Sequence, residues 1–215
     1  MASHLAASDI LRLIKCARGL HDLLELLMWR QNIKETSGGK ALMWGVTRGY
    51  EFFRLGPKPE LRVYEHTKRA IQLGADVSAK ITAAELWGNH RQRGAATVVT
   101  VAAMHPELVD TVELLLSHGA ETQRWSYNIS AFLPGGMDEA QKKACRDLIH
   151  LTSWEVETKE WHEKYAFYSP LALPFAMGQK RMVRLLLDHD ADASLLCWAN
   201  SGLSRSRLNV LHVVA

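Results

Sequence analysis

Three groups of residues in this sequence have types that could carry out chemistry: a glycine-rich stretch, a histidine–glutamate pair and the cysteines. Ser37-Gly-Gly-Lys40 has the spacing of the end of a phosphate-binding loop, but that loop needs glycine at Lys34 and a hydroxyl residue at Ala41. His162-Glu163 begins a zinc-protease pattern whose second histidine would be residue 166, which is alanine. No Gly-x-Ser-x-Gly or Gly-x-Gly-x-x-Gly sequence occurs. The sequence therefore predicts that the protein is not an enzyme.

The three cysteines, Cys16, Cys145 and Cys197, are an odd number at wide spacing. No Cys-x-x-Cys pair occurs, which argues against a disulfide framework. The nearest cysteine–histidine pairs, Cys16 with His21 and Cys145 with His150, are five residues apart and do not align on a helix face. We therefore expect reduced thiols, no metal site, no cofactor and a cytoplasmic or nuclear location.

The composition limits the class of partner. Of the 215 residues, 47% are hydrophobic and 23% are charged, which is enough apolar material for a sizeable core. The formal net charge of +3 is small for a protein that binds nucleic acid. No stretch reaches the roughly 18 apolar residues of a membrane span, and residues 1–7 lack the regions of a signal peptide. We expect neither a nucleic-acid nor a membrane partner, and a monomeric chain.

Three segments of the chain end alike, at Leu73-Gly-Ala-Asp76, His118-Gly-Ala-Glu121 and His189-Asp-Ala-Asp192. Counted back from the Gly or Asp, the residues at positions three, four and seven are apolar or small, which is the spacing of one helix face. These positions hold Ile71, Leu116 and Leu187, then Ala70, Leu115 and Leu186, then Thr67, Val112 and Val183. Each segment therefore predicts a helix that ends at a shared exit sequence.

A second, shorter pattern precedes two of these helices. Thr97 and Ser169 each begin a run of mostly apolar residues, and their hydroxyls are suited to capping a helix. A third copy of this run covers residues 209–215. The predicted unit is a short helix, a turn, a longer helix and an exit. At the exit a glycine, or Asp190 in the last copy, is expected to adopt the left-handed conformation.

This unit resembles the ankyrin repeat, whose pattern is Thr-Pro-Leu-His-x-Ala-Ala, a glycine turn and Leu-Leu-Leu-x-x-Gly-Ala-Asp. Residues 169–192 match it without a gap, including Gly178 at the turn, whereas the second copy has Pro106 in place of that glycine. The resemblance implies an all-α solenoid over residues 33–215, in which stacked helix pairs bury each other's apolar flanks. The repeats are expected at about 40–79, 95–125 and 169–195, with an incomplete one at 209–215.

The repeats are unevenly spaced. The exits at Asp76, Glu121 and Asp192 lie 45 and 71 residues apart, against about 33 for an ankyrin repeat. The larger excess leaves two alternatives for residues 126–168, a degenerate repeat or an insertion. Amphipathic spacing over residues 138–151, followed by a second expected helix at 153–165, favours the degenerate repeat.

Residues 1–32 carry a pattern of their own. Leu5-Ala-Ala-Ser-Asp-Ile-Leu-Arg-Leu13, followed later by Leu26-Leu-Met-Trp-Arg30, resembles the later helices of an F-box, without its opening Leu-Pro-x-Glu and first helix. The resemblance implies docking on the Skp-type adaptor of a cullin ubiquitin ligase. The adaptor-facing residues would be Leu11, Ile14, Leu20 and Leu24. The alternative is a helical cap for the repeat stack, without a link to a ligase.

The ankyrin resemblance implies that a protein partner binds where the exit loops and the short first helices line a concave face. Arg124, Trp125 and Tyr127 follow the second exit, and Trp198 follows the third. Tryptophan, tyrosine and arginine are enriched among residues that carry binding energy. The alternative is that Trp125 and Trp198 pack beneath long loops. We therefore predict a protein–protein interaction module, either the substrate receptor of a cullin-type ubiquitin ligase or a stand-alone ankyrin scaffold.

Overall fold

The protein is described here from a computed structural model. The structure describes residues 27, 30, 31, 33, 34, 38–49, 57–91, 93–133, 137–152, 166–194, 197–200 and 205–208. For residues 48, 49, 149–152, 166, 197–200 and 205–208 the description covers the backbone alone. Four of the sequence predictions lie outside the described residues: the helices of residues 1–26, the F-box-like positions Leu11, Ile14, Leu20 and Leu24, the helix at 153–165, and the incomplete repeat at 209–215.

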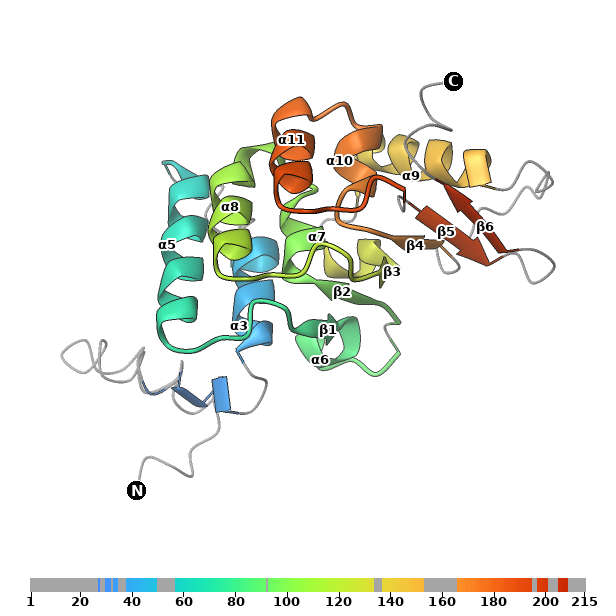
Figure 1. The fold of residues 1–215 in the computed structure, drawn as a ribbon. Coiled ribbons are helices and arrows are strands. Elements are labelled where there is room, and N and C mark those ends of the chain that lie inside the picture. The colour runs from blue at the N-terminus through green and yellow to red at the C-terminus, as the bar shows by residue number, and fades with distance from the viewer. Residues whose placement is uncertain are drawn as a thin grey trace.

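The described part of the chain is mostly helical, and its helices pack in pairs of neighbours along the chain. The pairs are α3 (Gly39–Trp44), continued by η3 (Gly45–Gly49), with α5 (Pro59–Gln72); α7 (Val98–Ala102) with α8 (Val109–Ser117); and α10 (Ala172–Ala176) with α11 (Lys180–Asp188). The second helices α5, α8 and α11 lie side by side in chain order, and α8 contacts both of the others (Figure 1). A short helix, η4 (Pro106–Leu108), leads into α8.

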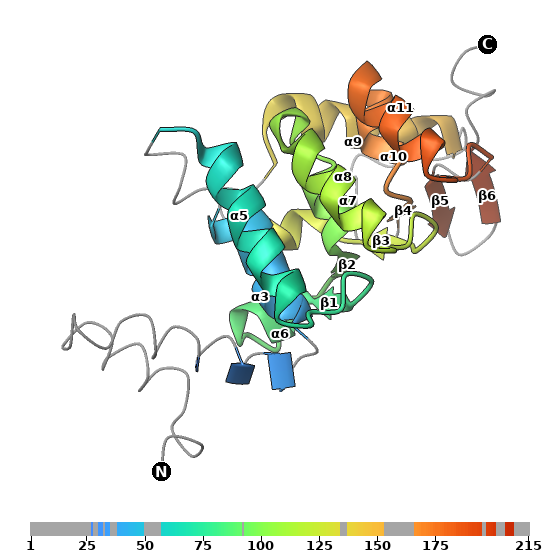
Figure 2. The same ribbon diagram turned by 60° about the vertical axis from the view of Figure 1, so that its left-hand side comes forward.

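Short strands connect the helix pairs. They are β1 (Lys80–Thr82), β2 (Ala95–Thr97), β3 (Ser126–Tyr127), β4 (Ala166–Tyr168), β5 (Cys197–Asn200) and β6 (Arg205–Leu208). They form one antiparallel sheet in chain order, which Figure 2 shows to one side of the helices. The expected all-α class is therefore wrong for the segments between the pairs. An extended segment needs partners for its backbone N–H and C=O groups, and antiparallel pairing supplies them.

The helix exits have the predicted geometry. Gly74, Gly119 and Asp190 adopt φ values of 90°, 84° and 61°, all in the left-handed region. In each copy the next amide donates to a carbonyl five residues earlier: Ala75 to Ala70 at 3.0 Å, Ala120 to Leu115 at 3.1 Å and Ala191 to Leu186 at 3.0 Å. This bond closes the last helical turn. The prediction that all three helices end in the same way is confirmed.

Of the two predicted helix caps, one is confirmed and the other is wrong. The Thr97 side chain is the N-cap of α7 and accepts from the Thr100 amide at 3.3 Å, as expected. Ser169 does not occupy the corresponding position, because α10 begins at Ala172 with Leu171 as its N-cap. The expected Ser169 cap is therefore wrong, since three residues, 169–171, separate strand β4 from the helix.

In chain order, residues 128–165 separate strand β3 from strand β4. Strand β3 pairs directly with β4, with Ser126 opposite Tyr168, and α8 contacts α11. The helix expected at 138–151 is confirmed as α9 (Glu139–Thr152), and it contacts α10, β5 and β6. Helices α8 and α11 are therefore in contact although residues 128–165 separate them in the chain. The 3₁₀-helix η5 (Ile129–Phe132) lies between β3 and α9 in the chain.

The extra residues between the first two exits also lie between two paired strands. Strands β1 and β2 pair, with Lys80 opposite Thr97, and α6 (Ala83–Trp87) lies between them in the chain. A capping box starts α6: the Glu85 amide donates to the Thr82 hydroxyl at 3.1 Å, and the Thr82 amide donates to the Glu85 carboxylate at 2.8 Å. The bond from the Thr82 amide, and a second from the Thr82 hydroxyl at 2.7 Å, lower the pKa of the Glu85 carboxyl group. The residues between β1 and β2, like those between β3 and β4, therefore leave α5 in contact with α8 and α8 in contact with α11.

Helix-to-helix contact decides the burial of the repeated face. On α8, Val112 is 0% exposed and Leu116 is 6% exposed. Leu187 takes the position of Leu116 on α11, and it is 42% exposed. Thr67 takes the position of Val112 on α5 and is also fully buried. Within the described residues its hydroxyl has no hydrogen-bond partner. A buried hydroxyl without a partner lowers stability.

Replacing Asp190 with glycine should raise the free energy of unfolding by roughly 0.5–1 kcal/mol, because glycine takes a left-handed φ without Cβ strain. Urea denaturation measures the change. As a control, Gly119→Ala should lower stability by about 1 kcal/mol through backbone strain alone, since nothing lies within 4 Å of the added Cβ. An unchanged or lower stability of Asp190→Gly would contradict the prediction.

Replacing Thr67 with valine should raise the free energy of unfolding by about 1 kcal/mol, because it removes the unpaired hydroxyl and keeps the shape of the side chain. The matched control is Thr47→Val. That change removes a buried hydroxyl that donates to the Met43 carbonyl at 2.7 Å, and it should lower stability. Equal losses in both variants, measured by thermal denaturation, would show that the Thr67 hydroxyl is satisfied.

Candidate functional site: the outward face of the sheet

On strands β3 and β4, one face of the sheet is buried and the other is partly open to solvent. Side chains alternate along a strand, so residues that are partners across strands share a face. The partners Ser126 and Tyr168 are both fully buried. Their neighbours Tyr127 and Phe167, also partners of each other, are half-buried. The second pair therefore belongs to the outward face, which presents aromatic rings.

A row of backbone partners crosses the sheet through Tyr127 and Phe167, whose side chains are half-buried. Ala95, Tyr127, Phe167 and Trp198 are successive backbone partners on strands β2 to β5. The Tyr127 and Phe167 rings are in contact, with centroids 5.5 Å apart and planes inclined at 51°. Tilted ring pairs at this distance attract each other beyond their area of contact. The pairing thus holds two large side chains in a fixed arrangement while leaving both partly open.

Positive charge lies beside these rings. The Lys80 ammonium is 5.8 Å from the centroid of the Tyr127 ring, within the range of a cation–π interaction. Partial burial lowers the pKa of Lys80, and the nearby Arg124 lowers it further. The Arg124 guanidinium donates to both carboxylate oxygens of Glu121, at 2.5 and 3.0 Å. This hydrogen bond lowers the pKa of Glu121 and raises that of Arg124.

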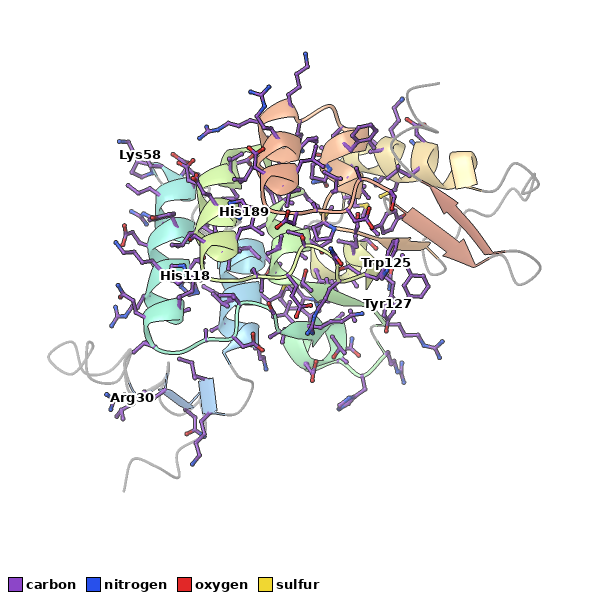
Figure 3. All side chains as sticks on the ribbon, viewed as in Figure 1. Arg30, Lys58, His118, Trp125, Tyr127 and His189 are labelled. Atoms are coloured by element: carbon purple, nitrogen blue, oxygen red, sulfur yellow. The ribbon has the colours of Figure 1, made fainter. Side chains whose placement is uncertain are left out.

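The ion pair of Arg124 with Glu121 orients Arg124 more than it stabilises the fold. Its two side chains are 43% and 49% exposed, so water screens the attraction. Figure 3 shows Trp125 and Tyr127 close together on the strand side of the molecule, directly after this pair in the chain. The segment from Glu121 to Tyr127 therefore presents a held guanidinium and two half-buried aromatic side chains.

Buried hydroxyls hold strand β3 against helix α7. The Ser126 hydroxyl donates to the Thr100 hydroxyl at 2.9 Å and accepts from the Thr97 amide at 3.3 Å. The Thr97 and Thr100 hydroxyls are also 2.9 Å apart. All three residues are at most 2% exposed, so these bonds form away from water. Because Ser126 is held inward, the next residue, Tyr127, takes the outward position.

Hydroxyls also join successive exits. The Ser78 hydroxyl donates to the Gly119 carbonyl at 3.3 Å and accepts from the Glu121 amide at 3.1 Å. Farther along, the Thr122 hydroxyl donates to the His189 carbonyl at 3.4 Å. Figure 3 places His118 and His189 at the ends of α8 and α11. Each exit is therefore tied to the next, which sets the spacing of the strands that follow.

The structure brings only some of the predicted partner-binding residues together. Arg124 is exposed, and Trp125 and Tyr127 are half-buried in the same segment. Trp198 is the backbone partner of Phe167, which places strand β5 beside the same row. Because Trp125 is half-buried, its burial favours neither of its two predicted roles, contact with a partner or packing beneath a loop. The short first helix α7 contributes nothing to the exposed surface, because all five of its residues are buried.

Sequence reasoning missed Lys80 and Phe167. Both lie on strands, whereas the prediction assumed loops, so strand pairing was not considered as a way to gather them. The one available signal was Phe167-Tyr168 directly before the Ser169 run, where adjacent aromatic residues would point to opposite faces of a strand. Only the pairing of β3 with β4 identifies which ring faces outward.

Other kinds of site are not apparent in the described part of the chain. No group of three or more His, Cys, Asp or Glu side chains is gathered there as metal ligands would be. Among the same residues, none of the helices combines the length and the apolar character needed to cross a membrane. No protein-family model, curated protein or solved structure matches this sequence.

Proposed function

We propose that the protein is a protein–protein interaction module that binds its partner on the outward face of the sheet. The observation that carries this proposal is the Tyr127–Phe167 ring pair, held at 5.5 Å by strand pairing and left half-exposed. Rigid aromatic side chains lose little entropy on binding and supply large contact areas. The adjacent Lys80 and Arg124 add donors for polar groups of a partner.

We further propose that the helix pairs form an ankyrin-type stack. Three features support this assignment: the repeated exit geometry, the side-by-side second helices α5, α8 and α11, and the strand pairs that leave the stack between helix pairs. In such a stack the connecting segments carry the binding surface, because the helices are occupied with packing against their neighbours. The aromatic row lies on these connecting segments.

The finer proposal is that the protein is the substrate receptor of a cullin-type ubiquitin ligase. It rests on the F-box-like sequence pattern of residues 5–30. In this proposal Leu11, Ile14, Leu20 and Leu24 face a Skp-type adaptor. The sheet face would then hold the target protein. A stand-alone ankyrin scaffold, in which the first 32 residues are a helical cap, is the alternative.

Tyr127→Ala should weaken partner binding about tenfold or more while changing stability by only about 1 kcal/mol, since its ring is half-exposed. The probes are peptides selected on the full chain from a random phage-displayed library. Affinity is measured by calorimetry and stability by thermal denaturation. Tyr168→Ala, on the buried face, should instead lower stability by about 3–5 kcal/mol.

Trp44→Ala is the matched control, because Trp44 is a 39% exposed aromatic side chain outside the sheet. It should leave peptide affinity unchanged, and an equal loss in Trp44→Ala and Tyr127→Ala would contradict the proposed surface. Trp125→Ala distinguishes its two roles: a large fall in melting temperature indicates packing, and lost affinity at unchanged stability indicates contact.

An adaptor pull-down separates the two versions of the function. If the protein is a ligase receptor, purified Skp-type adaptor should retain the full chain, and Leu11→Asp with Leu24→Asp should abolish retention. Absence of retention for the unmodified chain would remove the ligase proposal and leave the stand-alone scaffold. Neither result depends on Tyr127, so the sheet-face proposal is tested separately.

A further inference from the structure

A groove of about 670 Å³ opens between helices α5 and α8, away from the sheet. Three of its lining residues are apolar or aromatic: Leu61 is 50% exposed, and Tyr64 and Leu114 are half-buried. Figures 1 and 2 both show the two helices side by side, and Figure 3 shows Lys58 at the start of α5, at one end of the groove. The groove therefore offers an apolar floor with Leu61 as its most open side chain.

The charge around this floor is mainly negative. Glu60, Glu107, Asp110 and Glu113 line the groove, and Lys58 is the one basic residue in its lining. The chain as a whole carries a formal charge of +3, so this acidity is local. Complementary charge on a partner would be attracted here, and a negatively charged partner would be repelled.

Two of these carboxylates are available to a partner. Asp110 is already in an exposed ion pair with Arg181 of α11, at 3.0 Å. Glu60 and Glu113 take part in no ion pair within the described residues. They lie on different helices, one on each side of the groove. A segment lying in the groove would therefore meet a carboxylate on both sides of an apolar strip.

We propose that this groove is a docking site for a basic amphipathic segment of a partner protein. An apolar side chain of the segment packs on Leu61, Tyr64 and Leu114, and its Lys or Arg side chains pair with Glu60 and Glu113. Charge complementarity selects this occupant over an acidic peptide or a nucleic acid, whose phosphates the carboxylates repel. The site lies on α5 and α8, so it is separate from the aromatic row of the sheet.

The test uses a fluorescein-labelled peptide with one leucine between two arginine pairs, and a control peptide with glutamate in place of arginine. Fluorescence anisotropy with the full chain should show saturable binding of the first peptide and none of the second. Glu60→Lys and Glu113→Lys should each weaken binding about fivefold or more, and added salt should weaken it further. Leu61→Ala should weaken binding as well, since it removes the open part of the floor.

Matched controls make the result specific to the groove. Asp188→Lys makes the same charge change at an exposed position of α11 that does not line the groove, and Leu187→Ala removes another exposed leucine. Both should change affinity by less than about twofold. Circular dichroism confirms that each variant is folded.

Three results would overturn the proposal: no saturable binding of the basic peptide, an equal loss for Asp188→Lys and Glu113→Lys, or equal binding of the glutamate peptide. A concentration-dependent dimer that Glu113→Lys dissociates would show a second copy as the occupant, and would also overturn it. Tyr127→Ala should leave this binding unchanged. Failure of the groove and failure of the sheet surface are therefore distinguishable.

Discussion

Burial of the helix flanks is the constraint on which the rest of the structure depends. Each helix pair has an apolar flank that is buried only where a neighbouring pair covers it. The equivalent positions Leu116 and Leu187 show the effect directly, at 6% exposure where α11 lies alongside and 42% where no described helix does. The hydrophobic contribution is proportional to the area covered, so each contact between pairs adds stability.

Stacking also explains where the polar groups lie. Because the helix flanks pack against neighbouring helices, the connecting segments begin at the helix ends. The left-handed residues at these ends direct the chain away from the helices. Hydroxyls of Ser78 and Thr122 then tie one exit to the next. The strands that follow are consequently aligned closely enough to pair, and pairing divides their side chains between a buried face and an outward face.

The two candidate surfaces arise from this division in different ways. The sheet face is made by strand pairing, which brings Tyr127 and Phe167 together across 39 intervening residues. The groove is made by two packed helices whose outer residues take no part in stacking. The sheet face combines cations with aromatic rings, whereas the groove combines carboxylates with an apolar floor. Surfaces of opposite charge suit two partners of different chemistry.

The sequence alone determined the second helix of each pair and its left-handed exit, because these depend on local spacing and backbone conformation. The apolar positions around Leu115 and Leu186, and the left-handed residues Gly119 and Asp190, could be identified without tertiary information. Only the tertiary structure decided that the connecting segments are strands and that α8 contacts α11. Strand pairing joins residues far apart in the chain, and strands of two or three residues are too short for a recognisable alternation. For the same reason, sequence reasoning found Tyr127 but missed its partner Phe167.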